Sequence, residues 1–236
     1  MKNRRIVAIH QPNFFPWLGF FDKIHRSDLF VYLDHVENNP RDSLWTKRVK
    51  IIVSKGEYWL TIPLTRSKSS IFQRINEMKI RDMKIKRKHL PTIKQSYGKA
   101  PFFNDVFPLV MAFYETSDPS IANRNIIFID SVCEKLDIYT PKSRTSHYEW
   151  NEKSTDLLVE ILTHFNGTGY LCGGGAADYQ EDDKFERSGF DLIYQDFRHP
   201  TYPQFNSDTF VPGLSILDIL MNCGFEGTKQ LLKKSY

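Results

Sequence analysis

The sequence predicts an α/β protein whose mixed sheet opens with a β-α-β unit, includes a β-hairpin and packs against several helices. Two apolar runs, residues 6–9 and 29–33, flank a segment in which apolar residues recur at helical spacing, residues 17–24. Two further apolar runs, residues 49–53 and 58–62, flank a Lys-Gly turn signal that is typical of a hairpin. Helical patterns in the later segments favour a layered α/β architecture.

The opening unit brings a histidine to the end of a strand. Residues 6–9 are apolar and mostly β-branched, which is typical of a buried strand, and the run ends at His10. Pro16 can begin the next helix because its fixed φ angle suits the first helical position. The second strand, residues 29–33, is closed by Asp34. Because α/β folds often bind ligands at strand ends, both polar residues are candidates for a site.

Helices dominate the rest of the chain. The expected helices span residues 83–97, 103–114, 119–136, 152–165 and 214–221, and the expected later strands span residues 169–172 and 191–194. Asp118 is the expected N-cap of the third of these helices, with Pro119 at its first position. The last helix is expected to end before Gly224, and residues 67–70 should form a polar loop.

Length and composition predict one domain, residues 1–236, with no membrane-inserted segment. Hydrophobic residues make up 41% of the chain and charged residues 25%, which is ordinary for a globular protein. No apolar run approaches the roughly 18 to 20 residues that a membrane helix needs. Three widely spaced cysteines and no export signal favour reduced thiols and a cytoplasmic location.

The net charge gives little support for polyanion binding. The 32 basic and 28 acidic residues leave an excess of only +4, much of it within residues 79–99. This basic segment could meet the phosphates of a nucleotide-sugar or a carrier protein, or it could be a solvated helix face. It lacks interleaved aromatic residues and no recognised binding motif accompanies it, so no nucleic-acid partner is expected.

The loop after the first strand is the leading candidate for a small-molecule site. Its prolines fix backbone angles, so the loop can hold His10 and Gln11 toward a ligand, with Trp17 at its end. An imidazole can act as a general base or donate to a phosphate near pH 7. The alternative is that His10 only satisfies backbone groups at the strand end.

Asp34 and Arg48 could complete such a site. Asp34 should lie near His10 if the first two strands are parallel, so that its carboxylate orients the imidazole; alternatively it caps the following turn. Arg48 stands near Trp45 on a predicted strand and could grip a phosphate or carboxylate, or be an exposed strand charge.

The basic helix supplies three more candidates. His89 and Tyr97 lie eight residues apart, about two helical turns, so they should share a face. Basic neighbours make that face, and Lys99 beyond it, candidates for phosphate contact. Burial of His89 against the core is the alternative.

Cys172 ends a predicted strand just before three glycines. A thiol there could be a nucleophile activated by a histidine, while the glycine amides approach an anion; a small structural thiol is the favoured alternative. No metal or other cofactor is expected, because the seven histidines have no partners at zinc spacing and the glycines lack the phosphate-loop ending.

The last part of the chain adds four polar candidates. Tyr202 and Gln204 lie in a proline-containing loop and could contact sugar hydroxyls. Asp218 and Asn222 are four residues apart on the last predicted helix and can face one site. In an apolar helix such residues are either buried and hydrogen-bonded or functional.

Four blocks of the sequence resemble one protein family. Residues 9–24, Ile-His-Gln-Pro-Asn-Phe-Phe-Pro-Trp-Leu-Gly-Phe-Phe-Asp-Lys-Ile, are similar to the opening signature of WbqC-like proteins. Residues 88–103, 170–179 and 199–224 hold three further similar blocks, so the resemblance spans nearly the whole chain.

This resemblance implies a role in surface-polysaccharide, O-antigen or related biosynthesis. The leading hypothesis is acyl or aminoacyl transfer to an activated amino sugar or similar amine, with His10 as base, Asp34 orienting it, and Arg48 or Lys99 steering phosphate. The substrate would be a small molecule such as a nucleotide-sugar, and an acyl or aminoacyl carrier protein is a candidate donor.

Two alternatives to transfer stay open. One is a non-catalytic binding or assembly component of the same pathway. Nucleotidyl transfer is less favoured, because the sequence His10-Gln-Pro lacks the second histidine of the His-x-Gly-His pattern. The sequence gives no prediction of oligomeric state.

Overall fold

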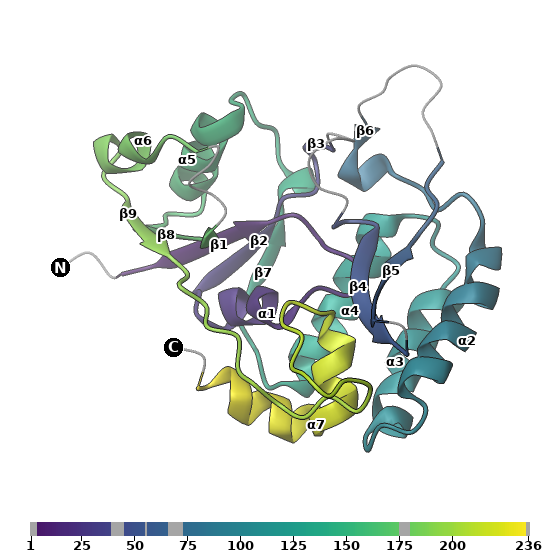
Figure 1. The fold of residues 1–236 in the computed structure, drawn as a ribbon. Helices are drawn as coiled ribbons and strands as arrows, with labels where there is room; N and C mark the ends of the chain where they lie inside the picture. The colour runs from purple at the N-terminus through teal and green to yellow at the C-terminus, as the bar shows by residue number, and fades with distance from the viewer. Residues whose placement is uncertain (1–3, 39–44, 55, 66–72, 175–179, 235–236) are drawn as a thin grey trace.

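A parallel sheet forms the centre of the protein (Figure 1). The computed structural model describes residues 4–38, 45–54, 56–65, 73–174 and 180–234. In this part of the chain the main sheet has the strand order β7-β2-β1-β8-β9, and every neighbouring pair is parallel. Its strands are β1 (Ile6–His10), β2 (Leu29–Tyr32), β7 (Lys142–Arg144), β8 (Gly169–Cys172) and β9 (Asp191–Tyr194).

The central strands are apolar on both sides because both faces of the sheet are covered. In β1, Val7 and Ala8 point to opposite faces and both are fully buried, and all of β2 is buried. His10 pairs in register with Tyr32 of β2, so the two strands end together. The predicted β-α-β opening is confirmed.

Helices pack on both faces of the sheet. They are α1 (Leu18–His25), α2 (Lys86–Tyr97), α3 (Phe103–Glu115), α4 (Ile121–Lys135), α5 (Ser154–His164), α6 (Asp182–Arg187) and α7 (Ile216–Leu232). The core on one face is shared by α1, α3, α4 and α7, and the core on the other by α5 and α6. Figure 1 shows α1 and α6 on opposite sides of the strands.

The direction in which the chain adds strands reverses between β1 and β8. From β1 the chain passes through α1 on one face to β2, and from β8 it passes through α6 on the other face to β9, in the opposite direction. In open α/β sheets the crevice outside the carboxyl ends of such a strand pair is the usual ligand site. His10 and Cys172 are the last residues of these two strands.

The predicted β-hairpin forms a sheet of its own. It joins β4 (Arg48–Val53) to β5 (Gly56–Thr61), and Gly56 takes a φ of 104° that other residues rarely adopt. A second small antiparallel pair, β3 (Glu37–Asn38) with β6 (Gln73–Arg74), was not predicted. Three single 3₁₀ turns complete the described elements: η1 (Ile75–Glu77), η2 (Met83–Ile85) and η3 (Thr145–His147).

One predicted helix start was wrong, and one predicted helix end is confirmed. Helix α4 begins at Ile121 and is capped by the Ser120 hydroxyl, because Pro119 and Ser120 pair in extended form with residues 79–80; Asp118 instead accepts from the Ser120 N–H. The helix that begins at Ile216 is interrupted at Gly224 as predicted, because Gly224 takes a non-helical φ of 70°, and a second helical segment follows it within α7. A Cβ at Gly224 would lie 2.8 Å from the Phe102 ring, so both the angle and the space require glycine.

Two further elements were missed, and one prediction falls on residues that the structure does not describe. The edge strand β7 and the short helix α6 escaped the sequence reading, and the predicted polar loop at residues 67–70 lies outside the described residues. None of the helices in the described ranges combines the length and the apolar character needed to cross a bilayer.

Candidate functional site

The crevice at the carboxyl ends of β1 and β8 is the candidate site. His10 ends β1, Cys172 ends β8, and the loop after β9 closes one side through Gln195, whose N–H donates to the Cys172 carbonyl at 3.0 Å. Helix α1, which follows the His10 loop, lies against the same edge: the Lys23 ammonium donates to the carbonyl of Ile9. Residues from three strands and one helix therefore meet at the point where the strand order reverses.

His10 is held as one tautomer. Its Nδ1 lies 2.9 Å from the Gln11 carbonyl, and because a carbonyl oxygen only accepts, Nδ1 carries the proton and Nε2 the lone pair. The edge of the Phe20 ring packs on the partly buried imidazole at 4.9 Å between centroids. Burial, and then the Lys23 ammonium, lower the His10 pKa to about 3. The imidazole is therefore neutral at physiological pH.

Lys23 is the residue of this crevice that the sequence reading missed. Only 3% of it is exposed, and its Nζ donates to the Ile9 carbonyl at 3.0 Å and lies 5.8 Å from the centroid of the Tyr170 ring. Burial lowers the Lys23 pKa to about 8. A signal was present, because the helix over residues 17–24 is apolar nearly all round, and polar residues in such a helix are buried with it.

Asp22, the neighbour of Lys23, is also fully buried. Its Oδ2 accepts from Gln195 Nε2 at 2.8 Å and lies 3.5 Å from Arg26 Nη1, while its Oδ1 has no partner among the described residues. Burial raises the Asp22 pKa. Gln195 also donates to the Gly19 carbonyl, so this amide fixes the loop after β9 to α1.

Cys172 lies at the end of β8 as predicted, but its thiol is protonated near pH 7. Its Sγ donates to the Ile193 carbonyl at 3.5 Å and accepts from Gln180 Nε2 at 3.8 Å. Burial raises its pKa, which opposes formation of a thiolate nucleophile. The geometry therefore favours the thiol as a lining residue, and its catalytic role stays a prediction.

Asp34 does not orient His10 as expected. Its fully buried carboxylate binds Arg144, with Oδ2 at 2.8 Å from Nε and 2.7 Å from Nη2, and also accepts from the Ser146 N–H and hydroxyl and from Thr145. The unpredicted strand β7 explains the difference, because it adds beside β2 and ends with Arg144.

Five predicted substrate-binding residues meet in a second, buried cluster. The Asp218 carboxylate accepts from Tyr97, Tyr202 and Gln204, each at 2.9 Å, and Asn222 donates to the Asp218 carbonyl at 2.8 Å. Burial raises the Asp218 pKa, and the three donors oppose that shift. Their predicted contacts with substrate are untested; in this structure their polar groups bond mainly to one another.

His199 connects this cluster to the start of α1. Its ring is near-parallel to that of Trp17 at 6.3 Å and tilted against that of Tyr202 at 6.1 Å. Its Nδ1 lies 3.1 Å from the Pro200 carbonyl, so Nε2 again carries the lone pair. His199 was not predicted as a site residue, yet its ring lies between those of two residues that were, Trp17 and Tyr202.

Of the remaining predicted residues, Gln11 lies beside His10, whereas Arg48, His89 and Lys99 belong to other parts of the fold. The Arg48 guanidinium stacks 4.2 Å from the Trp59 ring on the hairpin. His89 is 2% exposed and shares a hydrogen bond of 2.7 Å with the Tyr114 hydroxyl. The helix face that His89 shares with Tyr97 is therefore buried, and it does not form the predicted basic surface for phosphate contact. Lys99 is exposed beyond α2, and Gln11 is partly buried beside His10.

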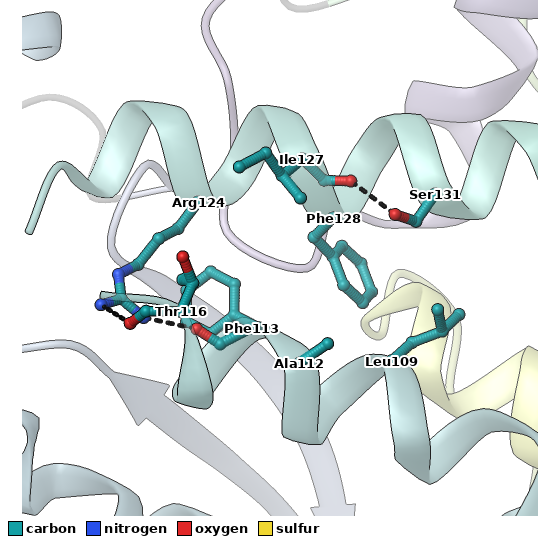
Figure 2. A pocket seen from close by; sticks show the side chains of 8 residues that line it. All are labelled: Leu109, Ala112, Phe113, Thr116, Arg124, Ile127, Phe128 and Ser131. Carbon is teal, nitrogen blue, oxygen red and sulfur yellow. Dashed lines mark hydrogen bonds between the residues drawn. The ribbon is translucent and has the colours of Figure 1, made fainter. Parts of the chain in front are cut away.

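A shallow pocket between α3 and α4 has a structural explanation (Figure 2). Its one charged lining residue, Arg124, donates to the carbonyls of Phe113 and Thr116 at 2.6 Å and so caps the end of α3. Figure 2 shows the guanidinium turned toward these carbonyls, with the Ile127 and Phe128 side chains beside it. Among the described residues, no three His, Cys, Asp or Glu side chains are grouped to hold a metal ion.

Comparison with known proteins gives the family. The model of the WbqC-like protein family matches residues 11–230. The chain belongs to this family. This WbqC-like protein is also 28% identical over 229 residues to the uncharacterized protein Rv1507c of Mycobacterium tuberculosis, a match that covers 95% of this chain and 96% of the relative. The resemblance predicted from the four sequence blocks is confirmed.

Among solved structures, the WbqC-like chain matches the laminin-binding adhesin (Lmb) of Streptococcus agalactiae. The match covers 98% of this chain and 100% of the adhesin at 10% identity, with a TM-score of 0.21.

Proposed function

We propose that this WbqC-like protein transfers an acyl or aminoacyl group to the amine of an activated amino sugar or similar molecule, in surface-polysaccharide or related biosynthesis. One observation carries the proposal: His10 stands at the end of β1, at the reversal of strand order, with Nδ1 bonded to the Gln11 carbonyl. Nε2 therefore carries the lone pair, held in a fixed orientation at the edge of the sheet where such folds bind small molecules.

The proposed reaction needs a proton acceptor beside the amine. The amine nitrogen forms a bond to the carbonyl carbon of a thioester donor, the carbon–sulfur bond breaks, and the released proton passes through His10 Nε2 to the leaving thiolate. Burial makes the imidazole a weak base, with a pKa of about 3. The amine nitrogen becomes more acidic once it bonds the carbonyl carbon, which favours proton transfer to such a base.

The test is product formation from nucleotide-activated amino sugars with acyl or aminoacyl thioesters, followed by mass spectrometry. His10→Gln should lower kcat by about 100-fold or more, the usual contribution of a proton-transferring side chain. The exposed His147 provides the matched control, and His147→Gln should leave turnover unchanged. Equal turnover by His10→Gln and the wild type would disprove the role.

The proposal includes a cytoplasmic location, where nucleotide-activated sugars are made.

The second candidate function is a non-catalytic binding component of the same pathway. Burial lowers the His10 pKa and raises the Cys172 pKa, so both groups are uncharged near pH 7. The absence of a charged base or nucleophile in these two groups favours this candidate. Saturable binding of the amino sugar without turnover by any donor, and unchanged binding by His10→Gln, would support it over transfer.

A further inference from the structure

Lys23 is a buried ammonium group that has no counter-ion among the described residues. It is 3% exposed, and the Ile9 carbonyl is its one hydrogen-bond acceptor in the described part of the chain. No carboxylate of the described residues lies within ion-pair distance of it; the nearest acidic residue in sequence, Asp22, is bonded to Gln195 and Arg26. An ammonium has three donors, so two of them have no acceptor in the described part of the chain.

A purely structural role explains this arrangement poorly. One hydrogen bond to a backbone carbonyl stabilises the protein by much less free energy than the burial of an unpaired charge costs. Buried lysines are therefore normally paired, and those that are not are found where a ligand supplies the opposite charge or where the group reacts. The surroundings of Lys23 decide which kind of ligand would fit.

Among the described residues, no negatively charged group faces Lys23 near pH 7, and unsubstituted backbone follows Cys172. The titratable groups that face Lys23 in this part of the chain are His10 from β1 and Tyr170 and Cys172 from β8. Burial lowers the His10 pKa and raises the Cys172 pKa, so both of these groups are neutral near pH 7. Beside Cys172, a Cβ added to Gly173 or Gly174 would meet no described atom within 4 Å. Open space next to unsubstituted backbone lets an anion approach closely.

We propose that Lys23 Nζ binds an oxyanion of the substrate, a phosphate oxygen of a nucleoside diphosphate group, in the crevice between the ends of β1 and β8. The inference deepens the proposed transfer, on which it rests for the identity of the sugar, because it names the part of an activated sugar that the crevice recognises. Anion binding itself is independent of acyl transfer.

The pH dependence of binding follows from the state of Lys23. The anion binds the ammonium form, and burial lowers the Lys23 pKa to about 8 in the free protein. Affinity should therefore be constant below pH 8 and fall by about tenfold per pH unit above it, and a bound anion should raise the Lys23 pKa.

The experiment uses isothermal titration calorimetry with uridine diphosphate and, separately, inorganic phosphate, at pH 7 and pH 9. Lys23→Met keeps the apolar stem and should weaken diphosphate binding at pH 7 by tenfold or more, whereas the exposed Lys135→Met should bind as the wild type does. Binding of phosphate alone places the contact at the phosphate group, and binding of the diphosphate only shows that both phosphates are needed; either result supports the inference.

Three results would overturn the inference: equal binding by Lys23→Met, wild-type affinity that is the same at pH 9 as at pH 7, or no binding of either anion. If Lys23→Met fails to fold, NMR titration of the Lys23 side chain in the wild type decides, since saturating diphosphate must raise its pKa. Lys23-dependent binding without acyl transfer would leave this inference standing and reject the proposed reaction. Transfer with Lys23-independent binding would do the reverse.

Discussion

Tyr97 and Asp218 stand 121 positions apart in the sequence, and the Tyr97 hydroxyl donates a hydrogen bond of 2.9 Å to Asp218 Oδ1. The same hydroxyl accepts from the Ile52 N–H at 3.2 Å. One phenol group therefore joins α2, β4 and α7.

We expect Asp218→Ala to destabilise the protein strongly. It leaves the Tyr97, Tyr202 and Gln204 donors buried without their acceptor, so the free energy of unfolding should fall by at least about 3 kcal/mol. Urea unfolding measures the change. Asp208→Ala, at an exposed position, is the control and should be neutral. A small effect of Asp218→Ala would mean that the cluster is held together by other contacts.

Asp34 and Arg144 should behave as one unit in stability measurements. Arg144→Met leaves a buried carboxylate without its counter-ion, and Asp34→Ala removes the acceptor of the guanidinium, so each should lower the free energy of unfolding by about 3 kcal/mol. The double variant should lose at least about 1 kcal/mol less than the sum of the two, because the second change removes a partner already lost. Strict additivity would contradict the pairing.

The His10 imidazole should make the protein sensitive to mild acid. Its pKa is about 3 when folded and near 6.5 when unfolded, so between these values the unfolded chain binds one more proton and folding stability falls as pH falls. From pH 6.5 to pH 5 the loss should be about 2 kcal/mol. This loss should be absent in His10→Gln, whereas His147→Gln, which removes an exposed imidazole, should retain it. The free energy of unfolding at several pH values provides the measurement.

Cys172→Ser should keep function. A hydroxyl can replace the thiol as donor to the Ile193 carbonyl, and no thiolate is lost because burial raises the Cys172 pKa. Product formation should change by less than about threefold, far less than removal of a true nucleophile would cost. Native-state alkylation of Cys172 should also be slow. Loss of turnover in Cys172→Ser with normal folding would restore the thiol as a nucleophile.

The predictable parts of the fold are those in which burial or a turn produces a recognisable pattern in neighbouring residues of the sequence. Strands β1, β2, β8 and β9 were placed from short apolar runs, and the hairpin from its turn signal. Strand β7, Lys-Ser-Arg, has no such pattern, because it is a three-residue edge strand whose side chains are only partly buried.

The candidate site was predictable in its residues but not in its connections. His10 and Cys172 were recognised at strand ends, yet only the strand order puts these ends side by side, and a single sequence does not reveal strand order. The same limit explains Asp34: its partner Arg144 comes from a strand that local pattern cannot show. Lys23 was missed because a lysine beside an aspartate usually marks the solvent side of a helix.

The central position of β1 has a consequence for biosynthesis. Arg5, just before β1, bonds Thr168, just before β8, across 163 residues, so the ribosome makes the middle strand of the sheet long before one of its two neighbours exists. Until β8 emerges, one edge of an apolar strand stays unpaired, a state that favours aggregation and chaperone binding. A nascent chain that stops short of residue 169 therefore lacks one wall of the crevice and also exposes the strand on which the other wall is built.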